Sequence, residues 1–222
     1  MSGGGKPRKE EDMIVVETDR VLRAIERETD ALLEYLLQVF LEIDFQEHSA
    51  LNGLTGGHVV TYLAREADRM ADELLAASGR PVPPPEPGRQ WDVETGSLRP
   101  GAVLIDDLHV SADRLRAALA AVEDWSTIDE PGRAIPGRRL LQLVVHHADL
   151  GRPWGEVPEE DAELAAALLP GADGGSASGG SATARLARAT GRDGVGSLGA
   201  APVGGATGGA AGTPCPPHPI WI

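Results

Sequence analysis

The alternation of apolar and polar positions predicts a series of helices in the first 169 of the 222 residues. Over residues 13–45, apolar side chains recur at intervals near three and four, while Glu, Asp and Arg occupy the other face. The same spacing returns over residues 51–78, 100–122 and 136–151. A shorter helix is expected over residues 158–169, where acidic side chains in the first turn suit the helix dipole.

The segments between these helices indicate how the helices are joined. Residues 79–92 contain a cluster of prolines that a helix does not accommodate, which predicts an extended connector. Residues 125–135 are expected to form a second loop. Four long helices joined in this way are typical of an all-α four-helix bundle, a fold whose core is a known place for metal sites.

Composition agrees with an all-α fold and excludes several functions. Hydrophobic residues make up 41% of the chain and aromatic residues only 4%, which suits packed helices better than a β-sandwich. The net charge of −14 argues against binding to nucleic acid or to anionic membranes. No apolar run approaches the roughly 20 residues that cross a bilayer, and the N-terminus does not resemble a secretion signal. With a single cysteine, no intramolecular disulfide is possible, so a cytoplasmic protein is the simplest expectation.

The two ends of the chain are expected to lie outside the folded domain. Residues 1–12 form a polar leader that is predicted to be disordered. Residues 170–222 hold half of the 28 glycines and show no sustained apolar periodicity, which predicts a disordered tail. The tail also resembles off-frame translation of a GC-rich gene, a hypothesis under which Cys215 and His218 carry no function. If resequencing of the gene shows the same reading frame intact, the off-frame hypothesis is wrong. The remaining residues, 13–169, are expected to form one helical bundle domain.

The helix predicted over residues 136–151 carries the polar residues of greatest interest. It is apolar around most of its circumference and should be buried, yet it contains Gln142, His146, His147 and Asp149. Gln142 and His146 are four residues apart and therefore lie on one face of the helix. Buried polar side chains need partners, and a metal ion is one way to provide them. The alternative is that these side chains form hydrogen bonds within the core or lie at an exposed helix end.

A third candidate ligand, His58, lies at the start of the helix predicted over residues 51–78. A lone histidine there is commonly a cap or a surface group, so its own signal is weak. In a bundle, however, His58 and the Gln142/His146 pair can meet at one end of the core. A catalytic zinc site uses about three protein ligands and leaves one position open for water or substrate.

Two sequence blocks resemble those of a known family. Residues 51–68, LNGLTGGHVVTYLAREAD, are similar to the LPGWTxGHVxxHLARNAD block of the mycothiol-dependent maleylpyruvate isomerase family. Residues 138–151, RRLLQLVVHHADLG, are similar to its RLREVxVHHVDLG block. The blocks occur in the family's order and at about its separation, and the helix pattern agrees over residues 13–169. The resemblance implies a DinB-like up-down four-helix bundle, with the short fifth helix and the disordered tail added to it.

The resemblance also implies a metal site. In the family a divalent metal, usually zinc, is held by three side chains, which correspond here to His58, Gln142 and His146. Gln142 stands where the family has a glutamate, and a neutral amide oxygen is a much poorer zinc ligand than a carboxylate. Asp149, one turn after His146, and Glu66 are alternative ligands.

Two further positions depart from the family blocks. Leu54 replaces the tryptophan of the first block, and Leu141 replaces an arginine of the second. Arg139 matches another arginine of that block and could orient an anionic group of the substrate, although an arginine in a first helical turn is often exposed. Asp149 could fix the tautomer of His146, or it could be an exposed or capping residue.

The chemistry that the resemblance implies is thiol-dependent isomerisation or thiol transfer. The open position of the metal takes a low-molecular-weight thiol, mycothiol in the bacteria that make it, and stabilises its thiolate. The thiolate then attacks a small electrophilic substrate such as an unsaturated acid. The alternatives are a metal-free helical-bundle module with a binding or regulatory role, and a degenerate or truncated family member.

Overall fold

The computed structural model describes residues 8–39, 45–47, 49–84, 92–169 and 180–192, and within these ranges every regular element is a helix. The α-helices are α1 (Arg8–Val39), α2 (Gly56–Ala77), α3 (Val93–Ser97), α4 (Gly101–Ala120), α5 (Glu130–Arg133), α6 (Ile135–Asp149), α7 (Glu159–Ala167) and α8 (Ala182–Ala189). Two short 3-10 helices are η1 (Trp125–Thr127) and η2 (Trp154–Glu156). The predicted all-α fold is confirmed.

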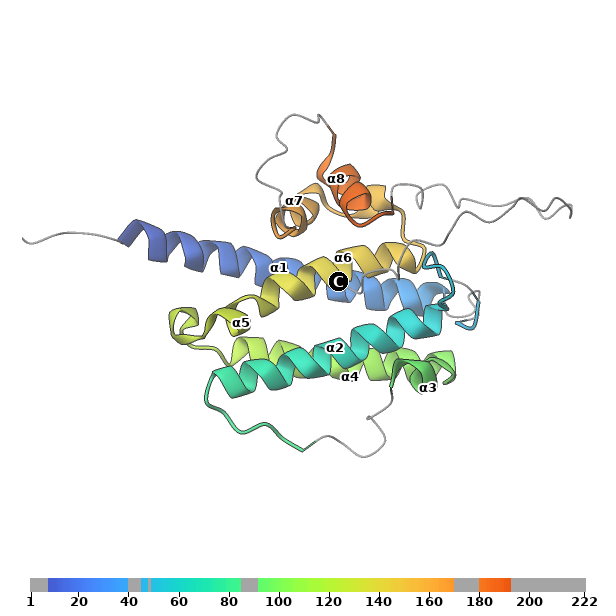
Figure 1. Cartoon of the computed structure of the whole chain (residues 1–222), viewed down its shortest axis with the longest axis horizontal. Coiled ribbons are helices and arrows are strands. Elements are labelled where there is room, and N and C mark those ends of the chain that lie inside the picture. Colours follow the sequence, from blue (N-terminus) through green and yellow to red (C-terminus); the bar gives the residue numbers. More distant parts are fainter. Residues whose placement is uncertain (1–7, 40–44, 48, 85–91, 170–179, 193–222) are drawn as a thin grey trace, which may run out of the picture.

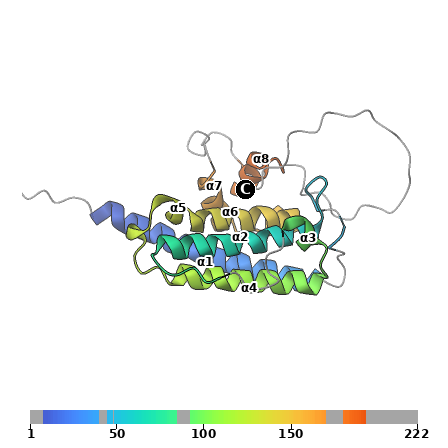
Figure 2. The same cartoon turned by 60° about the horizontal axis from the view of Figure 1, so that its bottom comes forward.

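Helices α1, α2, α4 and α6 form the four-helix bundle, and α7 and α8 lie together beside α6 (Figures 1 and 2). In the bundle, α6 packs against α1 and α2, and α4 packs against the same two helices from the other side. The bundle therefore has α1 and α2 between α4 and α6. Each long helix buries an apolar stripe in one common core.

The directions of the helices refine the predicted up-down arrangement. Side-chain contacts join Arg65 to Asp107 and Arg114 to Asp72, so α2 and α4 run parallel. Helix α3, the next helix along the chain, accordingly lies beside the start of α2, as Figure 1 shows.

Helix α6 is the most buried of the four. All of its residues except Arg138 are buried, in agreement with the prediction from its apolar circumference. Ile135, Leu140, Leu143, Val144 and Val145 are fully excluded from solvent. Its polar residues are therefore held inside the protein, where each must find a partner or remain unsatisfied.

The predictions for the two ends of the chain need correction. Helix α1 begins at Arg8, inside the predicted disordered leader 1–12, and α8 lies inside the predicted disordered tail 170–222. Helix α8 is short, but Ala182, Leu186 and Ala187 are buried, mainly against α7. Cys215 and His218 lie outside the described residues. Within the described residues, no helix is both long and apolar enough to cross a membrane.

Candidate functional site

A group of polar side chains meets at the interface between α2 and α6. Tyr62 and Glu66 are four residues apart and share one face of α2, and Gln142 and His146 do the same on α6. The amide nitrogen of Gln142 donates to the hydroxyl of Tyr62 and to Oε2 of Glu66, each at 3.2 Å. The ring of Tyr62 meets the imidazole of His146 edge to face, with the centroids 5.2 Å apart. The two residues predicted to share a face therefore do so, against a matching pair on α2.

The contact with Glu66 fixes the orientation of the Gln142 amide. A carboxylate only accepts hydrogen bonds, so the amide nitrogen must face Glu66 and Oε1 must point the other way. Gln142 is 1% exposed, and its Oε1 has no hydrogen-bond partner among the described residues. A buried carbonyl oxygen in this state favours a donor or a cation beside it.

The imidazole of His146 is held by Asp149. His146 Nδ1 lies 2.7 Å from Oδ2 of Asp149, and both side chains are fully buried. Burial lowers the pKa of His146, although the carboxylate opposes this effect. The ring is therefore neutral, with its proton on Nδ1 facing the carboxylate and its lone pair on Nε2. This is the arrangement that a metal-binding histidine requires, and it supports the expected role of Asp149.

Asp149 is in turn bound by Arg192, which sequence reasoning missed. Arg192 Nε and Nη2 donate to the two carboxylate oxygens of Asp149 at 2.6 and 2.9 Å. Burial alone would raise the pKa of Asp149, but hydrogen bonds from His146 and Arg192 outweigh it and lower that pKa. Arg192 follows α8 in the glycine-rich region. The only signal in the sequence was the short apolar spacing of Ala182, Leu186 and Ala187, which glycine content on both sides obscured.

His58 lies at the first turn of α2 and caps that helix. The hydroxyl of Thr55 accepts from the backbone N–H of His58, and His58 Nδ1 accepts from the backbone N–H of Thr55 at 3.2 Å, which makes a reciprocal capping box. The Thr55 hydroxyl also lies 2.7 Å from Nδ1. His58 Nε2 faces α3, where it is 3.4 Å from both Glu94 Oε2 and Ser97 Oγ.

Arg139 is buried. The sequence had left open that this residue, in the first turn of its helix, is exposed. It is 1% exposed, and its Nη1 donates to the backbone carbonyl of Leu63 at 3.0 Å. Burial lowers the pKa of Arg139 to about 10, although Glu66 and Tyr62 oppose the shift. The side chain therefore carries a positive charge inside the bundle at neutral pH.

The donor atoms at this interface fit a divalent metal ion in their chemistry. His146 offers a neutral imidazole, Gln142 offers an amide oxygen that lacks a partner, and the nearby carboxylate of Glu66 supplies negative charge. Within the described residues, however, no three His, Cys, Asp or Glu side chains are gathered closely enough to hold an ion. His58 in particular uses its ring nitrogens toward Thr55 and α3.

The fold and the site define a four-helix-bundle protein with inward-facing polar side chains on adjacent helices, the kind of place where bundle proteins build their sites. The family model for the mycothiol maleylpyruvate isomerase N-terminal domain matches residues 22–151, and the chain belongs to this family. The resemblance stated from the two sequence blocks is thereby confirmed. Arg192 and α8 lie beyond the matched residues.

Two solved structures are similar to this chain. One is a crystal structure of the mycothiol-dependent maleylpyruvate isomerase, and the other is a histidine-to-alanine mutant of that enzyme. Each is 23% identical, with a TM-score of 0.54, and the match covers 68% of this chain and 68% of that one. At this identity the likeness shows the fold. A comparison with curated proteins finds no match.

Proposed function

We propose that this protein is a thiol-dependent isomerase or thiol transferase of the maleylpyruvate isomerase type. It would use a low-molecular-weight thiol, mycothiol where that thiol is made, and act on a small electrophilic substrate. The observation that carries the proposal is the pairing of Gln142 and His146 with Tyr62 inside the residues that match the family. His146 also has the neutral, carboxylate-anchored state that a ligand needs.

We assign His58, Gln142 and His146 as the residues that would hold the ion, zinc or another divalent metal. When bound, such an ion would stabilise the thiol as its thiolate. Asp149 keeps the lone pair of His146 on Nε2. Glu66 binds the Gln142 amide nitrogen, so the amide oxygen faces away from Glu66 and is available as a ligand.

His58 would need to change its contacts to join the other two. Its Nε2 contacts with Glu94 and Ser97 are both 3.4 Å long, which is at the weak end of hydrogen bonding. Glu94 is exposed, and contacts of an exposed carboxylate contribute little stability. A metal on Nε2 would also require the ring proton of His58 to move to Nδ1, which would remove the contact that Nδ1 accepts from the Thr55 backbone N–H.

Metal content tests this assignment directly. Protein purified without a histidine tag should contain about one zinc per chain, and His146→Ala and His58→Ala should each lose it. Gln142→Glu should bind zinc at least as well as the wild type. Zinc that remains in both alanine variants would remove the assignment. The reaction is then tested by adding the thiol to an unsaturated acid and measuring the decrease in free thiol.

The second candidate is a metal-free bundle with a binding or regulatory role. Two observations favour it: the amide of Gln142 is bonded to Glu66 on one side, and His58 serves as part of a helix cap. Metal content separates the candidates. A wild type that never binds zinc, beside a Gln142→Glu variant that does, would support the metal-free candidate and identify one residue as its cause.

A further inference from the structure

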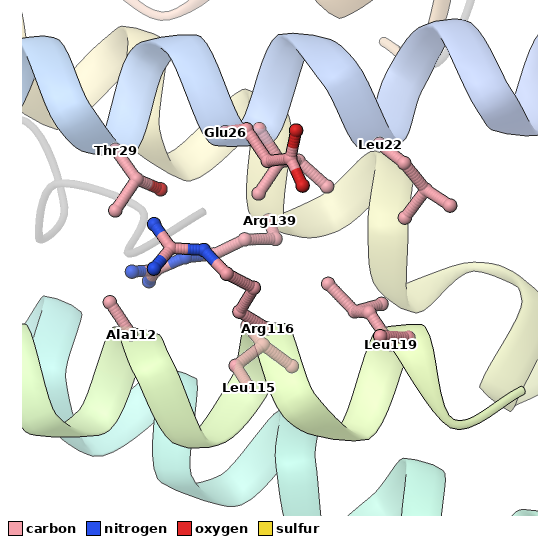
Figure 3. Close-up of a pocket in the computed structure, with 10 residues that line it drawn as sticks. Leu22, Glu26, Thr29, Ala112, Leu115, Arg116, Leu119 and Arg139 are labelled. Atoms are coloured by element: carbon pink, nitrogen blue, oxygen red, sulfur yellow. The ribbon is translucent and has the colours of Figure 1, made fainter.

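A cavity lies between α1 and α4, and Arg139 of α6 reaches it. Its volume is about 100 Å³. The walls are mainly apolar, from Leu22 and Ile25 of α1 and from Leu115 and Leu119 of α4. Figure 3 shows the one residue that α6 contributes, Arg139, whose side chain enters among these walls.

Arg139 brings an incompletely satisfied charge to this cavity. Its Nη1 is bonded to the Leu63 carbonyl, while its Nη2 is buried and has no hydrogen-bond partner among the described residues. In the view of Figure 3 the guanidinium lies between Thr29 of α1 and Ala112 of α4. A buried guanidinium that lacks an anionic partner in direct contact is costly, because burial removes its water without replacing it.

We propose that this cavity binds a small carboxylate, with Arg139 as its anchor. A guanidinium presents its N–H groups in a planar fork that matches a carboxylate, and the apolar walls suit the short carbon chain behind it. The volume of about 100 Å³ is several times the roughly 10–15 Å³ that one water molecule needs, which leaves room for a carboxylate with a short carbon chain. The ligand is thus a small acid, or the acid end of a longer molecule that extends through the opening.

The opening and the charge of the chain support a specific site. Glu26 and Arg116 lie at the same cavity and give it one charge of each sign near its exposed side. Arg116 is already paired with Asp30 and Asp113, so its charge is largely balanced. The whole chain has a net charge of −14 and repels anions in general. Carboxylate binding would therefore depend on Arg139 itself.

Carboxylate binding at Arg139 does not depend on the proposed function. Only the identity of the natural acid does: if the proposed function holds, that acid is the substrate. Arg139 lies about one turn before Gln142 and two turns before His146, so the three side chains lie toward the same side of α6. An acid held at Arg139 would approach the reactive centre along α6. Binding of a simple acid is tested without thiol or added metal.

Acetate is the probe, and the ¹⁵N–¹H signal of the Arg139 Nε group is the readout. The full-length protein is titrated with sodium acetate at constant ionic strength. We expect the Arg139 signal to shift and to saturate, whereas acetamide, which has the same shape but no charge, and sodium chloride should cause no saturable shift. The signal that disappears in Arg139→Lys is assigned to Arg139. In this variant acetate binding is measured from the methyl signals instead, and it should be weaker by at least tenfold.

A pair of leucine variants keeps the test independent of Arg139 itself. Ala112→Leu fills the cavity from α4 without removing the charge, and should weaken acetate binding at least tenfold. Ala117→Leu is the matched control on the exposed side of the same helix and should bind acetate as the wild type does. Equal shifts with acetate and chloride, or equal acetate binding in both leucine variants, would overturn the proposal. Acetate binding in a protein that never turns over thiol would leave it standing while the proposed function fails.

Discussion

Arg192 donates to both carboxylate oxygens of Asp149, at 2.6 and 2.9 Å, although 43 residues separate the two in sequence. Asp149 Oδ2 also accepts from Nδ1 of His146. All three side chains are buried, at 5%, 1% and 0% exposure. A residue outside the matched family domain therefore holds the carboxylate that orients the histidine of the candidate site.

Removal of Arg192 should destabilise the protein. Arg192→Met leaves the buried carboxylate of Asp149 without its cation, which should lower the free energy of unfolding by about 3 kcal/mol. Urea unfolding measures the change. Arg188→Met is the matched control, because Arg188 is exposed at the end of α8, four residues before Arg192, and its loss should change the free energy of unfolding by less than about 0.5 kcal/mol. Equal stability of the two variants would contradict a structural role for the Arg192–Asp149 pair.

The same ion pair predicts where the chain can be shortened. A chain that ends after residue 192 should unfold cooperatively with near wild-type stability, whereas one that ends after residue 169 loses α8 and Arg192 and should be less stable by several kcal/mol. Circular dichroism during urea unfolding distinguishes them. A chain ending after residue 169 that matches the longer one would show that the bundle domain over residues 13–169 is complete without α8.

Substitutions at Gln142 and Glu66 should show how much the single negative charge of this pair contributes to stability. Gln142→Glu places a second carboxylate beside that of Glu66, which is 3.2 Å from the present amide nitrogen. Without metal the variant should be less stable by about 1–3 kcal/mol, because like charges oppose each other and the hydrogen bond is lost. Zinc should restore its melting temperature.

The double variant Glu66→Gln with Gln142→Glu is the control for this exchange. It carries one carboxylate and one amide, as the wild type does, and should recover most of the stability lost in Gln142→Glu without any zinc. If the single and double variants melt at the same temperature, the contact between residues 66 and 142 has no energetic importance.

Two adjacent glycines at the start of α2 should respond differently to the same substitution. A Cβ atom on Gly57 would lie 2.4 Å from the backbone carbonyl oxygen of Ser97, so α3 would have to move. A Cβ atom on Gly56 would meet its nearest atom at 3.6 Å, an ordinary contact with the ring of Phe45. Gly57→Ala should therefore cost about 1–3 kcal/mol in urea unfolding, and Gly56→Ala much less.

Substitution of Gly57 should also change His58, because Ser97 and Glu94 of α3 face its Nε2. The ¹⁵N signals of the His58 ring should shift in Gly57→Ala and stay close to wild type in Gly56→Ala. Unchanged stability and unchanged His58 signals in Gly57→Ala would contradict the close packing of α2 on α3.

Stability should fall as the pH drops below about 6.5, partly because of His147. Burial and the positive charge of Arg152, whose Nη1 is 3.1 Å from His147 Nδ1, lower the pKa of His147 from 6.5 to about 3. Between these two values the unfolded chain binds a proton that the folded chain does not, so the free energy of unfolding decreases with falling pH. Above about pH 7.5 this group has no effect. Burial lowers the pKa of His146 as well, which adds to the same trend.

Urea unfolding at about pH 7 and about pH 4.5 measures this loss. His147→Gln removes the titrating group, so the free energy of unfolding should depend less on pH in this variant. The buried ion pairs should maintain part of the pH dependence. An identical dependence in His147→Gln and wild type would show that His147 takes up no proton on unfolding over this range.

Much of the fold and part of the site could be predicted from the sequence, because local patterns carry them. The apolar circumference of residues 136–151 predicted the buried helix α6. The spacing of Gln142 and His146 placed both on one face, which the structure shows facing α2. These features depend on neighbours a few residues away.

The rest depends on contacts between distant segments, which no local pattern records. The burial of Arg139 follows from its bond to the Leu63 carbonyl on α2, 76 residues away. Helix α8 is too short to be stable by itself and forms because α7 covers Leu186, so its sequence alone resembled a disordered tail. The sequence of the long connector between α2 and α4 does not indicate that these two helices run parallel.

The hydrogen bond between Gln142 and Glu66 has a consequence for how relatives of this chain are compared. Where the two family blocks have asparagine and glutamate, this chain has Glu66 and Gln142. A column-by-column alignment counts two unrelated changes. In space the two positions face each other, so one negative charge has moved from one helix to the other. Members of the family that lack the glutamate are better sorted by both positions together than by either one.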